Sequence, residues 1–133
     1  MTEQTVRRGL MREIKKVIPR AVALRHEDIF TAGIPDLSLS LNGKTSWWEV
    51  KIASPYCKSK AVQKHICQRL DATSYCRYVI YCLENSSGRS RQIRIVPPLE
   101  FDSWATAGVV VSHDTFDQGR VVRYMAQAHG VVA

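Results

Sequence analysis

Residues 33–51 of this chain read GIPDLSLSLNGKTSWWEVK, and their pattern predicts a β-hairpin. From position 36 to 41 polar and apolar side chains alternate, which is typical of a strand with one buried face. Asn-Gly at 42–43 is the strongest short signal for a two-residue hairpin turn, because both residues tolerate a positive φ. The returning strand over 45–53 is almost continuously apolar, which favours burial on both faces.

The Asn-Gly turn also sets the register of the hairpin. With these two residues at the tip, counting back along both strands places Asp36 directly opposite Glu49. A shift of one residue would bring apolar side chains onto the face of these carboxylates, so the alternation supports the same register. Lys51 lies two residues beyond Glu49 and is therefore expected on the same face.

Two facing carboxylates and a lysine form a candidate catalytic cluster. Their Cβ atoms are expected about 4.5–5.5 Å apart, where like charges destabilise a sheet unless a cation offsets them. Mg²⁺ suits this position because it takes one or two carboxylates and completes its shell with water and substrate phosphate. Lys51 would then orient or activate a water for attack on a phosphodiester. The alternative is an ordinary exposed ladder in which Lys51 balances the charges of Asp36 and Glu49.

Outside the hairpin, helical and extended patterns alternate. Apolar spacings of three and four predict a helix over 5–18 and a second helix that follows Ser59 and runs to about Asp71, with Val62, Ile66 and Leu70 along one stripe. Apolar runs predict strands over 21–26, 77–84, 91–96 and 108–112, with a loop over 85–90, a short helix over 97–106 and an undecided tail from 116. This alternation is typical of an α/β layered fold with a mixed sheet, here one domain with its core in 6–96 and a C-terminal extension over 97–133.

The composition of the chain limits the classes of protein to which it can belong. The 133 residues, 45% hydrophobic and 23% charged, suit one globular domain rather than a disordered chain. Nineteen Lys plus Arg against 12 Asp plus Glu give a net charge of +7, which favours a polyanionic partner, nucleic acid before a membrane. No apolar run is long enough for a bilayer and the first residues lack a secretion signal, so a cytoplasmic protein is expected. The four cysteines contain no C-x-x-C pair, which favours free thiols over structural zinc.

These motifs resemble those of a known family. The run G-I-P-D at 33–36 followed by E-V-K at 49–51 resembles the PD-(D/E)XK nuclease superfamily, and looks most like its VRR-NUC branch. That branch continues into a helix that carries a glutamine, which Gln63 matches. The spacing is also similar to that of archaeal-type Holliday-junction resolvases, which add an acid on the first helix. The resemblance covers roughly 6–84 and implies a restriction-endonuclease-like three-layer α/β/α core around a mixed central sheet.

The resemblance implies a Mg²⁺-dependent deoxyribonuclease, with Mn²⁺ as a substitute metal. Asp36 and Glu49 would hold the metal together with the backbone carbonyl of Val50. Lys51 would position the attacking water and stabilise charge on the phosphate. Gln63 would help to orient the lysine, the water or the nearby backbone. Gln68, one turn further along the helix, is the alternative glutamine.

The acid expected on the first helix is Glu13, which would bind a second metal or act through a water. The alternative for Glu13 is a solvated pairing with Arg8 or Lys16 on the helix surface. Glu3 is a rival acid, but it lies outside the periodic part of the helix and is expected far from the hairpin.

Basic side chains that follow the motif are candidates for phosphate contacts or, equally, for a solvated surface: Lys58, Lys60 and Lys64 after the E-V-K strand, and Arg89, Arg91 and Arg94 further along. Trp47 shares the face of the carboxylates, so it either stacks on a base or belongs to the core, as tryptophans in buried strands more often do. Trp48 is expected in the core.

The sequence thus predicts a small endonuclease acting on DNA, with RNA left open, and selective for junctions or flaps, because one small domain has little surface for base readout. A junction resolvase would be a homodimer, since two symmetric cuts need two sites. A restriction-type or homing-type enzyme is the alternative within this class. Other classes are a non-catalytic nucleic-acid-binding module with the same fold and a protein-binding domain whose basic surface is incidental.

Overall fold

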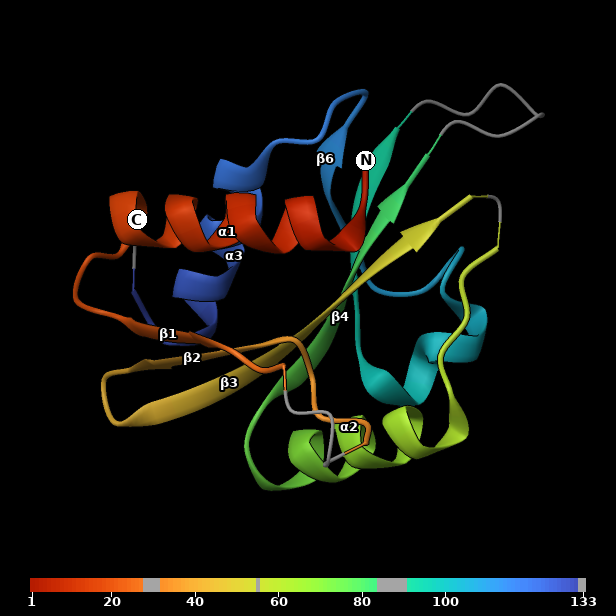
Figure 1. Ribbon diagram of the computed structural model, residues 1–133, viewed down its shortest axis with the longest axis horizontal. Coiled ribbons are helices and arrows are strands. Elements are labelled where there is room, and N and C mark those ends of the chain that lie inside the picture. Colours follow the sequence, from red (N-terminus) through yellow and green to blue (C-terminus); the bar gives the residue numbers. More distant parts are fainter. Residues whose placement is uncertain (28–31, 55, 84–90, 132–133) are drawn as a thin grey trace.

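The chain is an α/β protein with a six-stranded mixed sheet and flanking helices (Figure 1). The computed structural model describes residues 1–27, 32–54, 56–83 and 91–131. The strands are β1 (Val22–Arg25), β2 (Leu37–Leu41), β3 (Lys44–Ala53), β4 (Cys76–Cys82), β5 (Gln92–Val96) and β6 (Val109–His113). The helices are α1 (Glu3–Val17), α2 (Ala61–Thr73), α3 (Gln118–Ala128) and the short 3₁₀ helix η1 (Pro98–Ser103).

The strands lie in the sheet in the order in which they occur along the chain. β3 and β4 run parallel, and α2 connects them, as a parallel pair requires a crossover. The neighbouring pairs on either side of them are antiparallel. The sheet is therefore mixed, as the alternation of helical and extended segments predicts.

The predicted hairpin register is confirmed. Leu37 pairs with Trp48 and Leu41 pairs with Lys44 across β2 and β3. Asn42 and Gly43 both have positive φ, at 54° and 74°, which is the turn geometry that matches the twist of the two strands.

Helices cover both faces of the sheet (Figure 1). α1 and α3 pack on the face that carries Trp48 and Val50, which are fully buried there, and Trp48 is a core residue as expected. α2 and η1 pack on the opposite face, over Tyr78 and Ile80. The carboxylate of Glu49 belongs to this second face, next to α2, because successive side chains of β3 alternate between the faces.

Two elements differ from the sequence-based expectation. In α2 the predicted stripe is correct only in part: Leu70 is half-buried against the core, whereas Val62 is 43% exposed, and the fully buried residue is Cys67. The helix turns Cys67 toward the sheet because it packs over β4 and η1, where Cys67 joins Tyr78 and Phe101 in a second core cluster. The undecided tail contains α3, capped by Asp117.

Other expectations concern cysteines and membranes. All four cysteines are free thiols, with Cys67 and Cys76 buried and Cys57 and Cys82 half-buried. None of the helices in the described part of the chain has the length and apolar character needed to cross a membrane. The expected loop over 85–90, with Arg89, lies outside the described residues.

Candidate functional site

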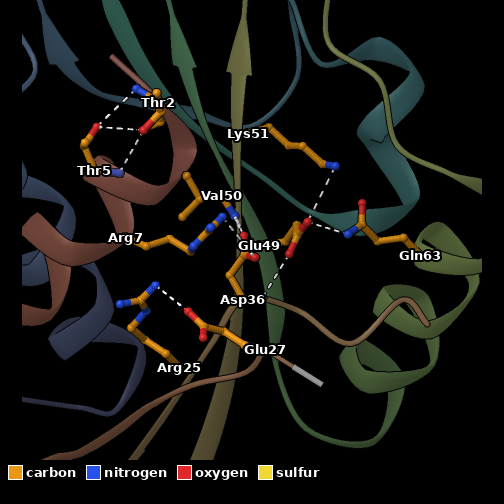
Figure 2. A network of polar contacts seen from close by, with 10 residues as sticks. All are labelled: Thr2, Thr5, Arg7, Arg25, Glu27, Asp36, Glu49, Val50, Lys51 and Gln63. Atoms are coloured by element: carbon orange, nitrogen blue, oxygen red, sulfur yellow. Dashed lines mark hydrogen bonds and ion pairs between the residues drawn. The ribbon is translucent and has the colours of Figure 1, made fainter. Parts of the chain in front are cut away.

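The two carboxylates meet where the ladder between β2 and β3 ends. Beyond the last pair, the backbone N–H of Asp36 donates to Glu49 Oε1 over 2.9 Å, and the N–H of Val50 donates to Asp36 Oδ2 over 2.9 Å (Figure 2). Asp36 and Glu49 therefore face each other, as the register predicts. Beyond this end of the ladder, the two carboxylates thus accept backbone N–H groups of the hairpin.

Glu49 is buried, with 4% of its surface exposed. Burial, followed by the nearby charge of Asp36, raises the pKa of Glu49 to about 9, although Lys51 acts in the opposite direction. Without a cation, burial and the charge of Asp36 thus favour the protonated form of the Glu49 carboxyl. A buried carboxyl beside a second carboxylate is an arrangement that a divalent cation would stabilise in its ionised form.

Lys51 and Gln63 converge on the second oxygen of Glu49. The Nζ of Lys51 lies 3.5 Å from Glu49 Oε2, and Gln63 Nε2 donates a hydrogen bond to the same atom. Figure 2 shows the lysine reaching this oxygen from β3 and the glutamine from α2. The structure thus brings together four of the predicted site residues, Asp36, Glu49, Lys51 and Gln63, with Val50 between the carboxylates.

The orientation of Gln63 is set by residues that sequence reasoning did not assign to the site. The hydroxyl of Ser59 donates to Gln63 Oε1 over 2.6 Å, and the Tyr78 hydroxyl lies 3.1 Å from Ser59 Oγ. Because Ser59 gives its one hydrogen to Gln63, Tyr78 is the donor to Ser59. This chain leaves only the amide nitrogen of Gln63 free to face Glu49. The position of Ser59 just before a predicted helix, four residues ahead of Gln63, was the available signal.

Arg7 is a second residue that the sequence did not single out. Its Nη1 lies 3.4 Å from Asp36 Oδ1, and both side chains are about one-fifth exposed, at 21% and 19%. Arg7 follows directly after the buried Val6 in the first turns of α1, so its position at the edge of the buried stripe was the signal.

Glu13 does not join this cluster. Its Oε2 lies 3.9 Å from Lys16 Nζ, which is the helix-surface pairing that the sequence left open. Its Oε1 lies 3.4 Å from the position that a Cβ on Gly119 would occupy, so Glu13 faces the beginning of α3. In the described part of the chain, no group of three or more His, Cys, Asp or Glu side chains could share a metal.

Glu3 lies in the first turn of α1. Burial raises the pKa of the Cys57 thiol to about 12, and the charge of Lys51 lowers this pKa whereas that of Glu3 raises it. Lys51 and Glu3 are therefore both within electrostatic reach of one thiol. α1 begins at Glu3 rather than two residues later, which carries this acid into the helix.

The candidate phosphate-binding residues lie in different surroundings. Lys58 and Lys60 are exposed in the segment that leads from β3 to α2, next to the cluster. Lys64 instead pairs with Asp102 over 2.9 Å, and Arg91 lies over the ring of Phe116 at 5.5 Å. Arg94 donates to backbone carbonyls of Trp104 and Ala107, so its role is structural. Trp47 is half-buried and packs against His26, with ring centroids 5.3 Å apart.

The donor set fits a hard divalent cation. The two facing carboxylates, of which Glu49 accepts the N–H of Asp36 and Asp36 accepts the N–H of Val50, offer only oxygen ligands together with the backbone carbonyl of Val50, and Mg²⁺ and Mn²⁺ prefer oxygen ligands. Comparison with known proteins assigns no family, since no protein-family model matches the chain and no curated protein matches it significantly.

Proposed function

We propose that the chain is a metal-dependent nuclease that hydrolyses DNA phosphodiester bonds. The observation that carries this proposal is the closed cluster at the end of the β2–β3 ladder, in which Lys51 and Gln63 meet one oxygen of the buried Glu49 opposite Asp36. The sheet between two helical layers is compatible with a restriction-endonuclease-like core. A net charge of +7 supports a polyanionic substrate.

Each residue of the cluster has a part in this reaction. Asp36, Glu49 and the carbonyl of Val50 would hold Mg²⁺ or Mn²⁺, which when bound supplies Lewis-acid activation of the phosphate and of a water. Lys51 lies on the same face and orients the attacking water. Gln63 holds Glu49 Oε2 in place through its amide, itself fixed by Ser59.

Substrate choice follows from the small size of the domain. Lys58 and Lys60 beside the cluster offer sequence-independent phosphate contacts. We therefore expect the protein to select branched DNA, such as flaps or junctions, by its structure and not by its base sequence. Symmetric cutting of a junction would require a homodimer, which sedimentation of the protein with and without junction DNA would reveal.

The direct test is a cleavage panel with labelled single-stranded, linear duplex, flap and four-way-junction DNA in Mg²⁺, Mn²⁺ or EDTA. The wild type should cut only with metal, and Asp36→Ala and Lys51→Ala should lose cleavage by about a hundredfold or more. Lys44→Ala is the matched control, because Lys44 is an exposed lysine at the far end of the same strand. If no substrate is cut while DNA binds with a steep salt dependence, the protein is a nucleic-acid-binding module instead.

A second prediction compares the two acids of α1. Glu3→Gln is expected to slow cleavage by about tenfold or more, because we assign to Glu3, the acid in the first turn of α1, the role of the helical acid that Glu13 does not fill. Glu13→Gln should stay within about twofold of the wild type, since its carboxylate faces Lys16 and α3. Single-turnover rates check this, with thermal unfolding to account for the loss of an acid from a helix N-terminus. A loss confined to Glu13→Gln would reassign the helical acid to Glu13.

A further inference from the structure

The four carboxylate oxygens of Asp36 and Glu49 have partners of two kinds. The inner oxygens, Asp36 Oδ2 and Glu49 Oε1, accept backbone N–H groups, each over 2.9 Å. The outer oxygens face side chains: Asp36 Oδ1 faces Arg7, and Glu49 Oε2 faces Lys51 and Gln63. A ligand can replace the outer partners without opening the hairpin, whereas the inner oxygens are tied to the backbone.

The contact between Arg7 and Asp36 is loose. Its 3.4 Å separation exceeds the 2.6 Å of the Arg77–Asp71 pair in the same protein. It also exceeds the ~2.7–2.9 Å of a strong charge-assisted hydrogen bond. The guanidinium therefore balances the charge of Asp36 but forms no tight bond that must be broken.

Among the described residues, most of the hydrogen-bonding capacity of Arg7 is unused. A guanidinium has about five N–H donors. Within the described residues, Asp36 is the one hydrogen-bond partner that Arg7 has. Arg94, by contrast, directs its donors to the carbonyls of Trp104 and Ala107. A partly buried arginine with free donors beside a carboxylate pair is suited to an oxyanion with two adjacent oxygens, as a phosphodiester provides.

We propose that Arg7 occupies the outer oxygen of Asp36, Oδ1, in the metal-free protein and moves to a phosphate of the substrate when a divalent cation takes its place. This inference rests on the proposed nuclease function. The cation and the guanidinium repel each other and compete for Asp36 Oδ1, so the exchange couples metal entry to phosphate capture. Arg7 is then a catalytic residue that contacts the substrate, and it weakens metal binding until substrate arrives.

The test separates metal binding from cleavage. Titration calorimetry with Mn²⁺, without DNA, compares the wild type with Arg7→Gln, Arg7→Lys and Arg8→Gln. Arg8 is the matched control because it is the exposed neighbour with the same charge. Arg7→Gln is expected to bind Mn²⁺ about tenfold more tightly, whereas Arg8→Gln and Arg7→Lys should stay within about twofold of the wild type. At saturating Mn²⁺, Arg7→Gln and Arg7→Lys should both cleave more slowly, the first by about a hundredfold.

The outcomes distinguish this inference from the proposed function. If the wild type cuts DNA but Arg7→Gln binds Mn²⁺ no more tightly than Arg8→Gln, Arg7 does not compete with the metal and the inference is overturned alone. If Arg7→Gln binds Mn²⁺ more tightly yet cleaves at the wild-type rate, the transfer to phosphate is wrong. A wild type that neither binds Mn²⁺ nor cuts DNA overturns the nuclease proposal, and this inference with it.

Discussion

Glu49→Gln is expected to lower metal-dependent cleavage by about a thousandfold and, at the same time, to stabilise the metal-free protein at alkaline pH. The first effect follows because an amide is a neutral and much weaker ligand for Mg²⁺ than a carboxylate. The second follows from the surroundings of Glu49, which is buried next to Asp36. The Glu49 carboxylate thus favours metal binding, but it lowers the free energy of unfolding of the metal-free protein at alkaline pH.

The sign of the pH dependence follows from the raised pKa. In the folded protein the pKa of Glu49 lies near 9, above its ordinary value of 4.5. The folded state therefore binds a proton more tightly than the unfolded state, and the stability that this proton contributes is complete below about pH 4.5 and lost as pH rises through about 9. We expect the free energy of unfolding in EDTA to fall by at least about 2 kcal/mol between pH 5 and pH 9.

Urea unfolding at pH 5, 7 and 9, in EDTA and in Mg²⁺, measures this dependence. Glu49→Gln should be nearly independent of pH, and Mg²⁺ should restore the wild type at pH 9 because it binds the ionised pair. Glu100→Gln, which changes an exposed acid of η1, should behave as the wild type. A wild type whose stability in EDTA does not change between pH 5 and pH 9 would show that Glu49 is ionised in the folded protein.

The pairing of Asp36 with Glu49 could be predicted because two independent signals agree on it. The Asn-Gly turn defines the tip of the hairpin, and the alternation along β2 rejects a shifted register. Both signals are local in sequence, so they need no knowledge of the tertiary structure. The same holds for Lys51, which follows from the period of β3.

Contacts that depend on how a helix is rotated were harder to predict. In α2 the hydrophobic spacing favoured Val62 for the buried side, but packing over β4 and η1 turned Cys67 inward. That same rotation directs Gln63 toward Glu49. Arg7 was not assigned to the site either, because its role depends on the approach of α1 to the end of β2, which no pattern within one element specifies.

The secondary structure of the C-terminal tail from residue 116 could not be predicted, for a different reason. Gly119 and the valine pair at 121–122 have low helix propensity, although Asp117 supplies a helix cap. α3 forms because Val121, Val122 and Met125 are fully buried against the sheet and α1. Tertiary burial therefore overrides local helix propensity here. As a consequence, the side chain of Glu13 faces Gly119 in the first turn of α3 and not the carboxylate cluster.

Gly33→Ala is expected to destabilise the protein more than Gly43→Ala does and to slow cleavage by about a hundredfold. Both glycines have positive φ, at 87° and 74°, so an alanine is strained at either position. A Cβ on Gly43 would have no atom within 4 Å, whereas a Cβ on Gly33 would lie 3.0 Å from the Val62 carbonyl oxygen and 3.1 Å from Gln63 Cα. Both contacts at Gly33 are with backbone atoms, which cannot rotate away as a side chain can.

Comparing Gly33→Ala with Gly43→Ala separates the effect of the close contact between the Gly33 loop and α2 from the effect of backbone strain. Gly43→Ala should lower the free energy of unfolding by about 1 kcal/mol through backbone strain alone, and Gly33→Ala by about 2–3 kcal/mol because the clash adds to the strain. The clash separates α2 from the loop that leads into Asp36, and so moves Gln63 away from Glu49. Urea unfolding and single-turnover cleavage well below the melting temperature measure the two effects. Equal losses of stability with full cleavage in both variants would mean that Gln63 keeps its place without the close contact at Gly33.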